Sequence, residues 1–317
     1  MTDLRWGILS TARINDALLA ADAADFVAVA SRSLPRAEAY AREKGIPQAY
    51  GTYDALLADP GIDAVYLSLP NHLHIPWSIR ALEAGKHVLC EKPLSRRADE
   101  VVEAFDVAQA AGLVLAEGFM WRHHPQVGRA LDLLAAGAVG RLGLIRARFS
   151  GPVALPGDPR LDRVMDGGAL MDVGCYCVSG ARTLAGAEPE QVAAMRVVGG
   201  ANVDVILTGL LRFPGDVLAA IDCGFALTSQ YGLEAVGDEG SLRLLDPWHA
   251  RSPVIEVARE GEPVERIEVE RVNHYALQLR DFAEAVADGR APLVGREDAV
   301  AQARAIEALY GAAEAPA

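Results

Sequence analysis

The sequence predicts a two-domain α/β protein. An N-terminal Rossmann dinucleotide-binding domain is followed by an α+β domain that contains a large, open, mainly antiparallel sheet. Two patterns support this. Short apolar runs alternate with stretches of helical length from Leu4 to Glu117, and strand-like runs follow one another closely from Gln191 to Glu270. Because 317 residues is long for a single core, we expect domains at residues 1–122 and 123–317.

Strands and helices alternate in the first domain. Gly45, Gly85 and Gly112 each follow a predicted helix, as C-terminal capping glycines do. This order predicts a parallel sheet with right-handed crossovers. The predicted strands are Arg5–Leu9, Phe26–Ser31, Ala64–Leu69, His87–Cys90 and Leu113–Ala116. The predicted helices are Asn15–Ala24, Pro35–Lys44, Tyr53–Leu57, Pro76–Ala84 and Arg97–Ala110.

The second domain is predicted to begin with a helix at Pro125–Ala135 and a strand at Leu144–Phe149. Residues Asp166–Leu184 are interpreted as one helix that ends at Gly186. No crossover helices separate the later strands, so their sheet is expected to be antiparallel. These strands are Val203–Phe213, Val217–Ala226, Leu233–Val236, Ser241–Leu245, Val254–Ala258 and Arg266–Val269. Two final helices, Tyr275–Asp288 and Arg296–Ala313, are expected to pack back on both domains.

The composition indicates a soluble globular protein, with 51% hydrophobic and 23% charged residues. A formal charge of −13 argues against nucleic acid or an anionic membrane as a partner. A strand-like run begins within a few residues of Met1, which leaves no room for a signal peptide. Cys175 and Cys177 have the wrong spacing for a zinc pair and are expected to pack as small apolar residues. We therefore expect a cytoplasmic protein with no bound metal.

The turn after the first strand is where a dinucleotide-binding fingerprint would place glycines, and this chain has Ser10, Ala12 and Asn15 there. Small residues still allow the backbone to approach a pyrophosphate, and the following helix supplies N–H donors. Thr11 adds a hydroxyl and Arg13 a positive charge. The alternative is a turn that binds nothing.

The end of the second strand favours NADP over NAD. An NAD-binding domain presents an acidic residue to the ribose hydroxyls here, whereas this chain reads Ser31-Arg32-Ser33. Two hydroxyls and a guanidinium would bind a 2′-phosphate through charge-assisted hydrogen bonds. The alternative for Arg32 is an ordinary surface residue that opens a helix.

Lys92 is the residue around which the expected site is arranged. It follows the apolar run His87–Cys90, and Pro93 then ends the strand. A lysine at this sheet edge would hold a hydroxyl or a developing alkoxide. Pro70 ends a neighbouring strand, so Asn71 is expected at the same edge, within reach of the ribose or nicotinamide. His74 is expected to begin a helix rather than to bind a metal.

Two further segments carry candidate substrate residues. Gly118–Pro125 concentrates aromatic and cationic groups, with Trp121 as an apolar wall and Arg122 and His124 as donors, or else it forms a hinge. Asp172 and Tyr176 are four residues apart and would share one face of a helix. Taken alone, Tyr176 would be a packing residue; together with Lys92 it becomes a candidate acid/base.

Four motifs resemble the glucose–fructose oxidoreductase and inositol dehydrogenase family, also written Gfo/Idh/MocA. They are Gly7-Ile-Leu-Ser-Thr-Ala-Arg-Ile14, Leu69-Pro-Asn-His-Leu-His74, Ala84-Gly-Lys-His-Val-Leu-Cys-Glu-Lys-Pro-Leu94 and Gly167-Gly-Ala-Leu-Met-Asp-Val-Gly-Cys-Tyr176. Tyrosine rather than histidine at the last position is similar to the NADP-using branch of dihydrodiol and aldose (xylose-type) dehydrogenases. The phosphate turn departs from the family because no fingerprint glycine remains there.

The resemblance implies an oxidoreductase that transfers hydride between nicotinamide and a carbon of a sugar, polyol or cyclic diol. Tyr176 would be the acid/base, assisted by Lys92 and Asp172. NADP is the expected cofactor, with NAD possible. The expected cofactor-binding residues are Ser10, Thr11, Ala12, Arg13, Ile14, Ser31, Arg32, Ser33, Leu69, Pro70, Asn71, His74, Glu91 and Lys92. The expected substrate-binding residues are Trp121, Arg122, His124 and Tyr176.

Other functions stay open at this point. The same family includes NAD-dependent glycoside hydrolases, and a non-catalytic NADP(H) sensor would share the fold. The apolar face of the antiparallel sheet predicts a homodimer or homotetramer. The loop Gly151–Arg163 is expected to shape the substrate pocket. Neither the substrate nor the physiological direction follows from the sequence.

Overall fold

A computed structural model describes residues 4–153 and 157–314, and it divides into two compact units. The first unit comprises the chain up to His123 together with residues 273–300. The second comprises residues 124–272 and the chain from Ala301 onward. Residues 154–156, within the loop expected to shape the substrate pocket, lie outside the described residues.

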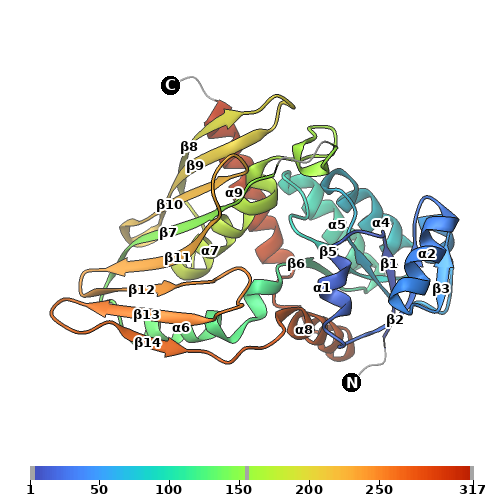
Figure 1. Ribbon diagram of the computed structural model, residues 1–317, viewed down its shortest axis with the longest axis horizontal. Coiled ribbons are helices and arrows are strands. Elements are labelled where there is room, and N and C mark those ends of the chain that lie inside the picture. The colour runs from blue at the N-terminus through green and yellow to red at the C-terminus, as the bar shows by residue number, and fades with distance from the viewer. Residues whose placement is uncertain (1–3, 154–156, 315–317) are drawn as a thin grey trace. The chain divides into compact units, whose positions relative to one another are not determined.

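The first unit contains a six-stranded parallel sheet in the order β3-β2-β1-β4-β5-β6, with helices on both faces (Figure 1). The order reverses between β1 and β4, which is where open α/β sheets bind ligands. The strands are β1 (Arg5–Leu9), β2 (Asp25–Ala30), β3 (Gln48–Tyr50), β4 (Ala64–Leu67), β5 (His87–Glu91) and β6 (Leu115–Gly118). The helices are α1 (Asn15–Leu19), α2 (Leu34–Lys44), α3 (Tyr53–Leu57), α4 (His74–Glu83), α5 (Ala98–Ala111) and α8 (His274–Asp288).

The core of this unit joins segments that are far apart in the sequence. Trp6 of β1 is buried against Phe282 of α8, with ring centroids 5.0 Å apart. Leu18 of α1 and Leu279 of α8 belong to the same apolar cluster. Helix α8, which comes late in the chain, is therefore part of the Rossmann unit.

Helix α1 is shorter than predicted, because it ends at Leu19 rather than Ala24. Its last turn tightens, with the N–H groups of Ala21 and Asp22 donating to carbonyls three residues back. Asp22 then takes a left-handed φ of 47°, which turns the chain into β2. The composition of this segment favours helix, and the need to reach β2 overrides it.

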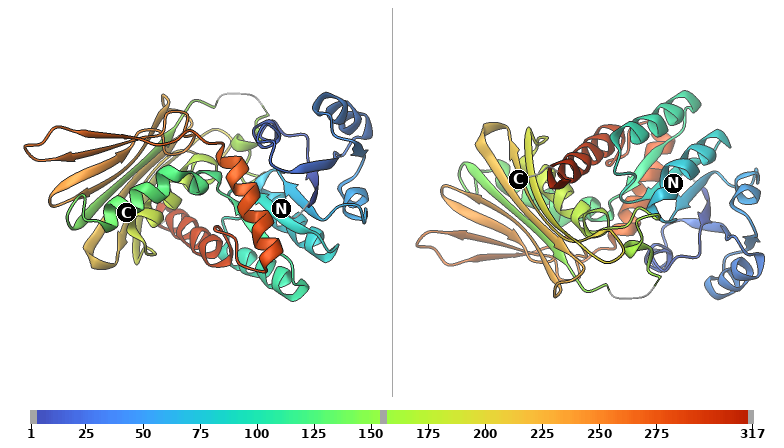
Figure 2. Two further views of the ribbon diagram at one scale, coloured as in Figure 1. Left: turned by 90° about the horizontal axis from the view of Figure 1, so that it is seen from below. Right: turned by 90° about the horizontal axis from the view of Figure 1, so that it is seen from above.

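The second unit is built on an eight-stranded sheet in the order β14-β13-β12-β11-β7-β10-β9-β8. Helices α6, α7 and the later part of α9 lie on one face of this sheet, and no helix of the second unit's described residues covers its other face (Figure 2). The strands are β7 (Leu142–Ser150), β8 (Gln191–Val198), β9 (Asp204–Phe213), β10 (Val217–Gly224), β11 (Gln230–Gly237), β12 (Gly240–Leu244), β13 (Val254–Arg259) and β14 (Glu265–Glu268). The helices are α6 (Pro125–Ala135), α7 (Cys175–Ala185) and α9 (Arg296–Glu314).

One pair of strands in this sheet is parallel. β10 runs alongside β7 in the same direction, with Ile221 paired to Ala147, while every other pairing in this sheet among the described residues is antiparallel. The expectation of a mainly antiparallel sheet is confirmed. The chain between β7 and β10 contains α7, β8 and β9, and a parallel pair requires a long connection of this kind.

The predicted single helix over Asp166–Leu184 is wrong in its first part. Asp166 and Gly168 have left-handed φ values of 60° and 129°, so helical structure begins only after them. Leu170–Gly174 then forms a π-helical turn, and α7 follows it. The end is as predicted, with Gly186 as a left-handed cap at φ 61°. Asp172 therefore lies in the π turn, and Tyr176 is the second residue of α7.

Within residues 4–153 and 157–314, no helix combines the length and the apolar character needed to cross a membrane.

Candidate active site

The turn after β1 replaces the fingerprint glycines with a buried polar network. Ser10 Oγ lies 2.7 Å from Ser68 Oγ and accepts a hydrogen bond from the Ala12 N–H. Ser68 Oγ also bonds Asn15 Oδ1 at 2.6 Å, and Asn15 Nδ2 donates to the Ser10 carbonyl. Three polar side chains therefore tie this turn to the end of β4. Ser68 was not among the predicted site residues.

Ser10 has a φ of 146°, a conformation that favours glycine and strains a residue with a Cβ by about 1–3 kcal/mol. Ser10→Ala keeps this strain and loses the Oγ bonds, whereas Ser10→Gly loses the bonds and relieves the strain. We therefore expect the Gly variant to be more stable than the Ala variant by about 1–3 kcal/mol, measured by urea unfolding. An Ala variant at least as stable as the Gly variant would contradict this reading of the turn.

A cationic cluster lies where α2 begins. Ser31 is buried at the end of β2, while Arg32, Ser33 and Arg36 are exposed. Arg36 Nε donates to Thr11 Oγ1 at 2.8 Å, which joins this cluster to the turn after β1. In the described part of the chain, Ser33 makes no capping hydrogen bond to α2. Arg36 was missed, although its position four residues after Arg32 could have indicated it.

These groups suit the 2′-phosphate of NADP. The first turn of α2 contains no acidic residue, and its free N–H groups carry a partial positive charge. Arg32 and Arg36 both lie close enough to Tyr53 to lower the pKa of its phenol, although burial raises that pKa by more. Two guanidinium groups thus lie near Tyr53, at the start of the helix that Ser31 and Ser33 precede.

Lys92 is half-buried at the end of β5, beside a set of buried groups. Glu91 is buried and accepts a hydrogen bond of 2.5 Å from the buried Tyr66 hydroxyl. Tyr275 of α8 lies within electrostatic range of Glu91 and Lys92. Burial and the Glu91 charge raise the pKa of its phenol, and the Lys92 charge opposes this rise. Neither Tyr66 nor Tyr275 was predicted, because they come from β4 and α8 and no local motif connects them to Lys92.

His74 holds the loops after β4 and β5 together. It is buried, with Nδ1 2.8 Å from the Pro93 carbonyl oxygen and Nε2 2.8 Å from that of Leu69. Burial lowers the pKa of His74 to about 4 even though both carbonyls favour the charged form, so the ring is neutral and donates to one carbonyl at a time. The ring connects the loops that carry Asn71 and Lys92 rather than presenting a free edge to a cofactor.

The predicted substrate residues near Trp121 have structural contacts. Trp121 is fully buried, so it offers no open wall. Arg122 pairs with Asp298, its Nη1 lying 3.2 and 3.3 Å from the two carboxylate oxygens. His124 is buried and caps α6 by accepting from the Gln126 N–H, and burial lowers its pKa. This helix cap explains the placement of His124 without a substrate.

In the second unit, the loop before the π turn contacts Asp172. Arg160 Nη1 lies 3.5 Å from Asp172 Oδ2, and Arg160 also forms a bidentate pair with Asp158 at 2.9 and 2.6 Å. A Cβ at Gly167 would clash with the Arg160 carbonyl, so this loop can lie against the segment only because residue 167 is glycine. Gly167 thus allows the close approach of this loop, whose Arg160 guanidinium lies beside the Asp172 carboxylate. Arg160 was not predicted as a site residue.

Tyr176 lies at the start of α7 against the sheet. Its ring packs edge-on to Phe149 of β7 at 5.3 Å and is tilted against Trp248 at 5.8 Å. Only 6% of the residue is exposed, so the phenol has a fixed environment. Asp172 and Tyr176 thus belong to the second unit, and Lys92 belongs to the first.

In the described part of the chain, no three His, Cys, Asp or Glu side chains gather in an arrangement that could hold a metal ion. All four cysteines are free and buried, and burial raises the pKa of Cys90, Cys177 and Cys223 well above the usual thiol value.

These features define a class of protein: a Rossmann-type dinucleotide-binding unit joined to a unit with an open β-sheet. Residues 6–119 match the family model described as "Oxidoreductase family, NAD-binding Rossmann fold". Residues 127–243 match the model described as "GFO/IDH/MocA C-terminal domain". The chain therefore belongs to the GFO/IDH/MocA oxidoreductase family, as the motifs indicated.

Named relatives cover nearly the whole chain. D-xylose 1-dehydrogenase (NADP(+)) 2 of Haloferax volcanii is 37% identical over 323 residues, which is 98% of both chains. Trans-1,2-dihydrobenzene-1,2-diol dehydrogenase of Oryctolagus cuniculus is 36% identical over 78% of this chain and 76% of its own. The crystal structure of KijD10, a 3-ketoreductase from Actinomadura kijaniata in complex with NADP and TDP-benzene, superposes with a TM-score of 0.92 at 33% identity, covering 98% of both chains.

Proposed function

We propose that this protein is an NADP(H)-dependent dehydrogenase or reductase that acts on a carbinol or carbonyl carbon of a sugar, polyol or cyclic diol. The cofactor assignment rests on the cluster of Ser31, Arg32, Ser33 and Arg36. Its cations and hydroxyls match a 2′-phosphate, and the first turn of α2 has no acidic side chain that would repel this phosphate. The xylose and dihydrodiol dehydrogenases among the relatives support the substrate class.

Bound nicotinamide supplies or accepts the hydride, which is the chemistry of the cofactor. The chain must bind both reactants, align them and move one proton. We assign the proton transfer to the Tyr176 phenol, which donates to the reacting oxygen during reduction and accepts from it during oxidation. An unperturbed tyrosine has a pKa near 10, so a neighbouring cation is needed to favour the phenolate.

Lys92 is the proposed source of that cation. We propose that its ammonium group and the Tyr176 hydroxyl act on the same substrate oxygen. The pairing of Glu91 with Tyr66 and the bridge that His74 makes between two loops support this role, because they fix the backbone on either side of Lys92. Asp172, held by Arg160, is proposed to accept a hydrogen bond from a substrate hydroxyl or from Lys92.

A panel of aldoses, inositols and cyclic diols, assayed by absorbance at the nicotinamide band, tests this function directly. NADP and NAD are run in parallel. We expect turnover of at least one substrate class and a preference for NADP. NADPH binding without turnover of any substrate in either direction would instead favour a sensor.

We also propose that a second copy of this chain covers the outer face of the eight-stranded sheet. Met195, Leu210 and Leu218, on β8, β9 and β10, point to this face, with Met195 80% and Leu210 58% exposed. Exposed apolar groups on neighbouring strands are typical of an interface.

Light scattering at several concentrations should give the mass of a dimer or tetramer. Met195→Glu/Leu210→Lys should lower this mass, while Leu293→Lys, at an exposed leucine of the first unit, should not. A monomeric wild type would refute the proposal.

A further inference from the structure

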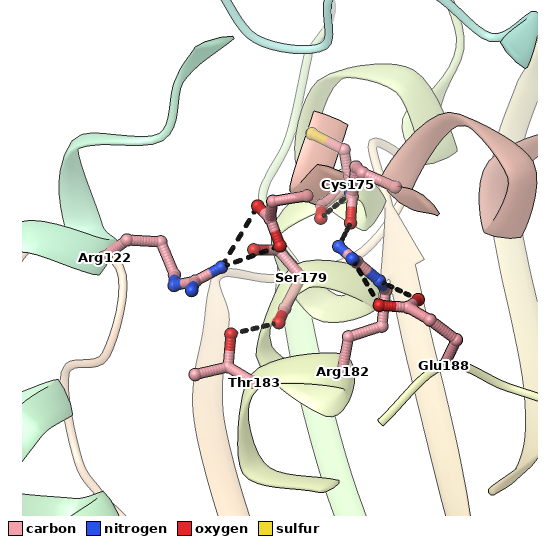
Figure 3. Close-up of polar contacts among 8 residues, drawn as sticks. Arg122, Cys175, Ser179, Arg182, Thr183 and Glu188 are labelled. Carbon is pink, nitrogen blue, oxygen red and sulfur yellow. Dashed lines mark hydrogen bonds and ion pairs between the residues drawn. The ribbon is translucent and has the colours of Figure 1, made fainter. Parts of the chain in front are cut away.

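A chain of polar contacts in the second unit links the exposed Glu188 to the backbone beside Tyr176. Arg182 of α7 is only 4% exposed, and it forms a bidentate pair with Glu188 at 2.6 and 2.8 Å. Figure 3 shows this pair of Arg182 and Glu188, joined by dashed lines. Arg182 also contacts Gln302 of α9, whose Oε1 accepts a hydrogen bond from Arg182 Nη1 at 3.0 Å.

The chain ends on the backbone beside Tyr176. Gln302 is 1% exposed, and its Nε2 donates to the Cys175 carbonyl oxygen at 2.8 Å. Cys175 is the first residue of α7 and directly follows the π turn Leu170–Gly174. The helical hydrogen-bond pattern changes at this junction. The position of the Tyr176 side chain, on the next residue, therefore depends on the contacts that fix the Cys175 backbone.

We infer that Gln302 and Arg182 are positioning residues that fix the junction between the π turn and α7, and with it the Tyr176 phenol. This inference rests on the proposed role of Tyr176. Gln302 uses both ends of its amide: the oxygen accepts from a cation that Glu188 holds, and the nitrogen donates to the backbone. The amide therefore cannot flip without breaking both bonds.

Energetics agree with a positioning role. Arg182 loses hydration on burial although its partner Glu188 is 54% exposed, and well-packed apolar residues of similar size often give equal or greater stability than such a pair. The stability of the folded unit therefore does not by itself require Arg182 and Gln302. Catalysis does require precise placement, since a displacement of about 1 Å at a reacting group can cost roughly 100-fold in rate.

Gln302→Glu is the most informative variant because it keeps the shape of the side chain. Its carboxylate still accepts from Arg182 but has no N–H to donate, so it repels the Cys175 carbonyl. Arg304→Gln, an exposed position on the same helix, is the matched control. We expect Gln302→Glu to raise hydrogen exchange in the peptide covering residues 170–180 and to lower kcat roughly 10-fold, with the KM for NADPH unchanged.

The double variant Arg182→Met/Gln302→Leu separates positioning from folding. It should unfold at a temperature close to that of the wild type and still show the faster exchange and the lower kcat. Wild-type exchange at residues 170–180 together with wild-type kcat in Gln302→Glu would overturn the inference. A uniform rise in exchange across the second unit would do so too, because it would indicate a purely structural role.

The exchange measurement needs no substrate, and the kinetic arm uses the best substrate of the panel. If Tyr176→Phe keeps full turnover, the proposed role of Tyr176 fails, whatever Gln302 does. If Tyr176→Phe loses turnover and Gln302→Glu changes nothing, only the positioning inference fails.

Discussion

Tyr176→Phe is expected to lower turnover by roughly 10²–10⁴-fold and to leave NADPH affinity nearly unchanged. The variant removes one hydroxyl and keeps the ring, so the contacts with Phe149 and Trp248 persist and the fold is preserved. Steady-state kinetics give kcat, and the change in protein fluorescence on titration with NADPH gives the Kd.

Tyr231→Phe is the control for this variant. Tyr231 lies on β11, and its ring also packs edge-on against Phe149, at 5.3 Å. Loss of a hydroxyl in this aromatic cluster is therefore common to both variants, and only Tyr176→Phe should lose turnover. Near-full turnover in Tyr176→Phe would remove the acid/base assignment.

Replacing Arg32 and Arg36 together with Gln should raise the Kd for NADP at least 100-fold and change the Kd for NAD little. A hydrogen bond to a charged group contributes about 1.5–3 kcal/mol, and 1.4 kcal/mol corresponds to a factor of ten. NAD has no 2′-phosphate, so it loses no such contact. Isothermal titration with both dinucleotides measures the two affinities.

Arg42→Gln, in the last turn of α2, controls for the loss of positive charge. It should leave the preference for NADP intact. Equal losses of affinity for NADP and NAD in the Arg32/Arg36 variant would show that these residues do not read the 2′-phosphate.

Segments with a strong local pattern were predicted well. β1, α3 and α6 have the predicted bounds, because an apolar run or an amphipathic period coincided with clear end signals. β3 was missed because three residues, Gln48–Tyr50, are too few to show a period. The π turn at Leu170–Gly174 was also missed, since its residues have the composition of an ordinary helix.

The candidate site likewise contains residues that the sequence indicated and residues that it did not. Ser10, Arg32 and Lys92 follow predicted strands, and the ends of parallel strands are where such sheets bind ligands, so their positions in the sequence were enough to make them candidates. Tyr66, Tyr275 and Arg160 contribute through contacts between distant segments. His124 matched a binding pattern, yet it serves as a helix cap.

By itself, the sequence determined most of the order of strands and helices and the dinucleotide-binding class of the first unit, and it predicts a phosphate-bearing cofactor. These depend on local periodicity and on which residue follows which strand. Only the tertiary structure decided that β10 pairs parallel to β7, that Asn15 and Ser68 hold a strained Ser10, and that Gln302 bonds the backbone beside Tyr176. Each of these joins residues far apart in the chain, and such contacts form only when the whole unit packs.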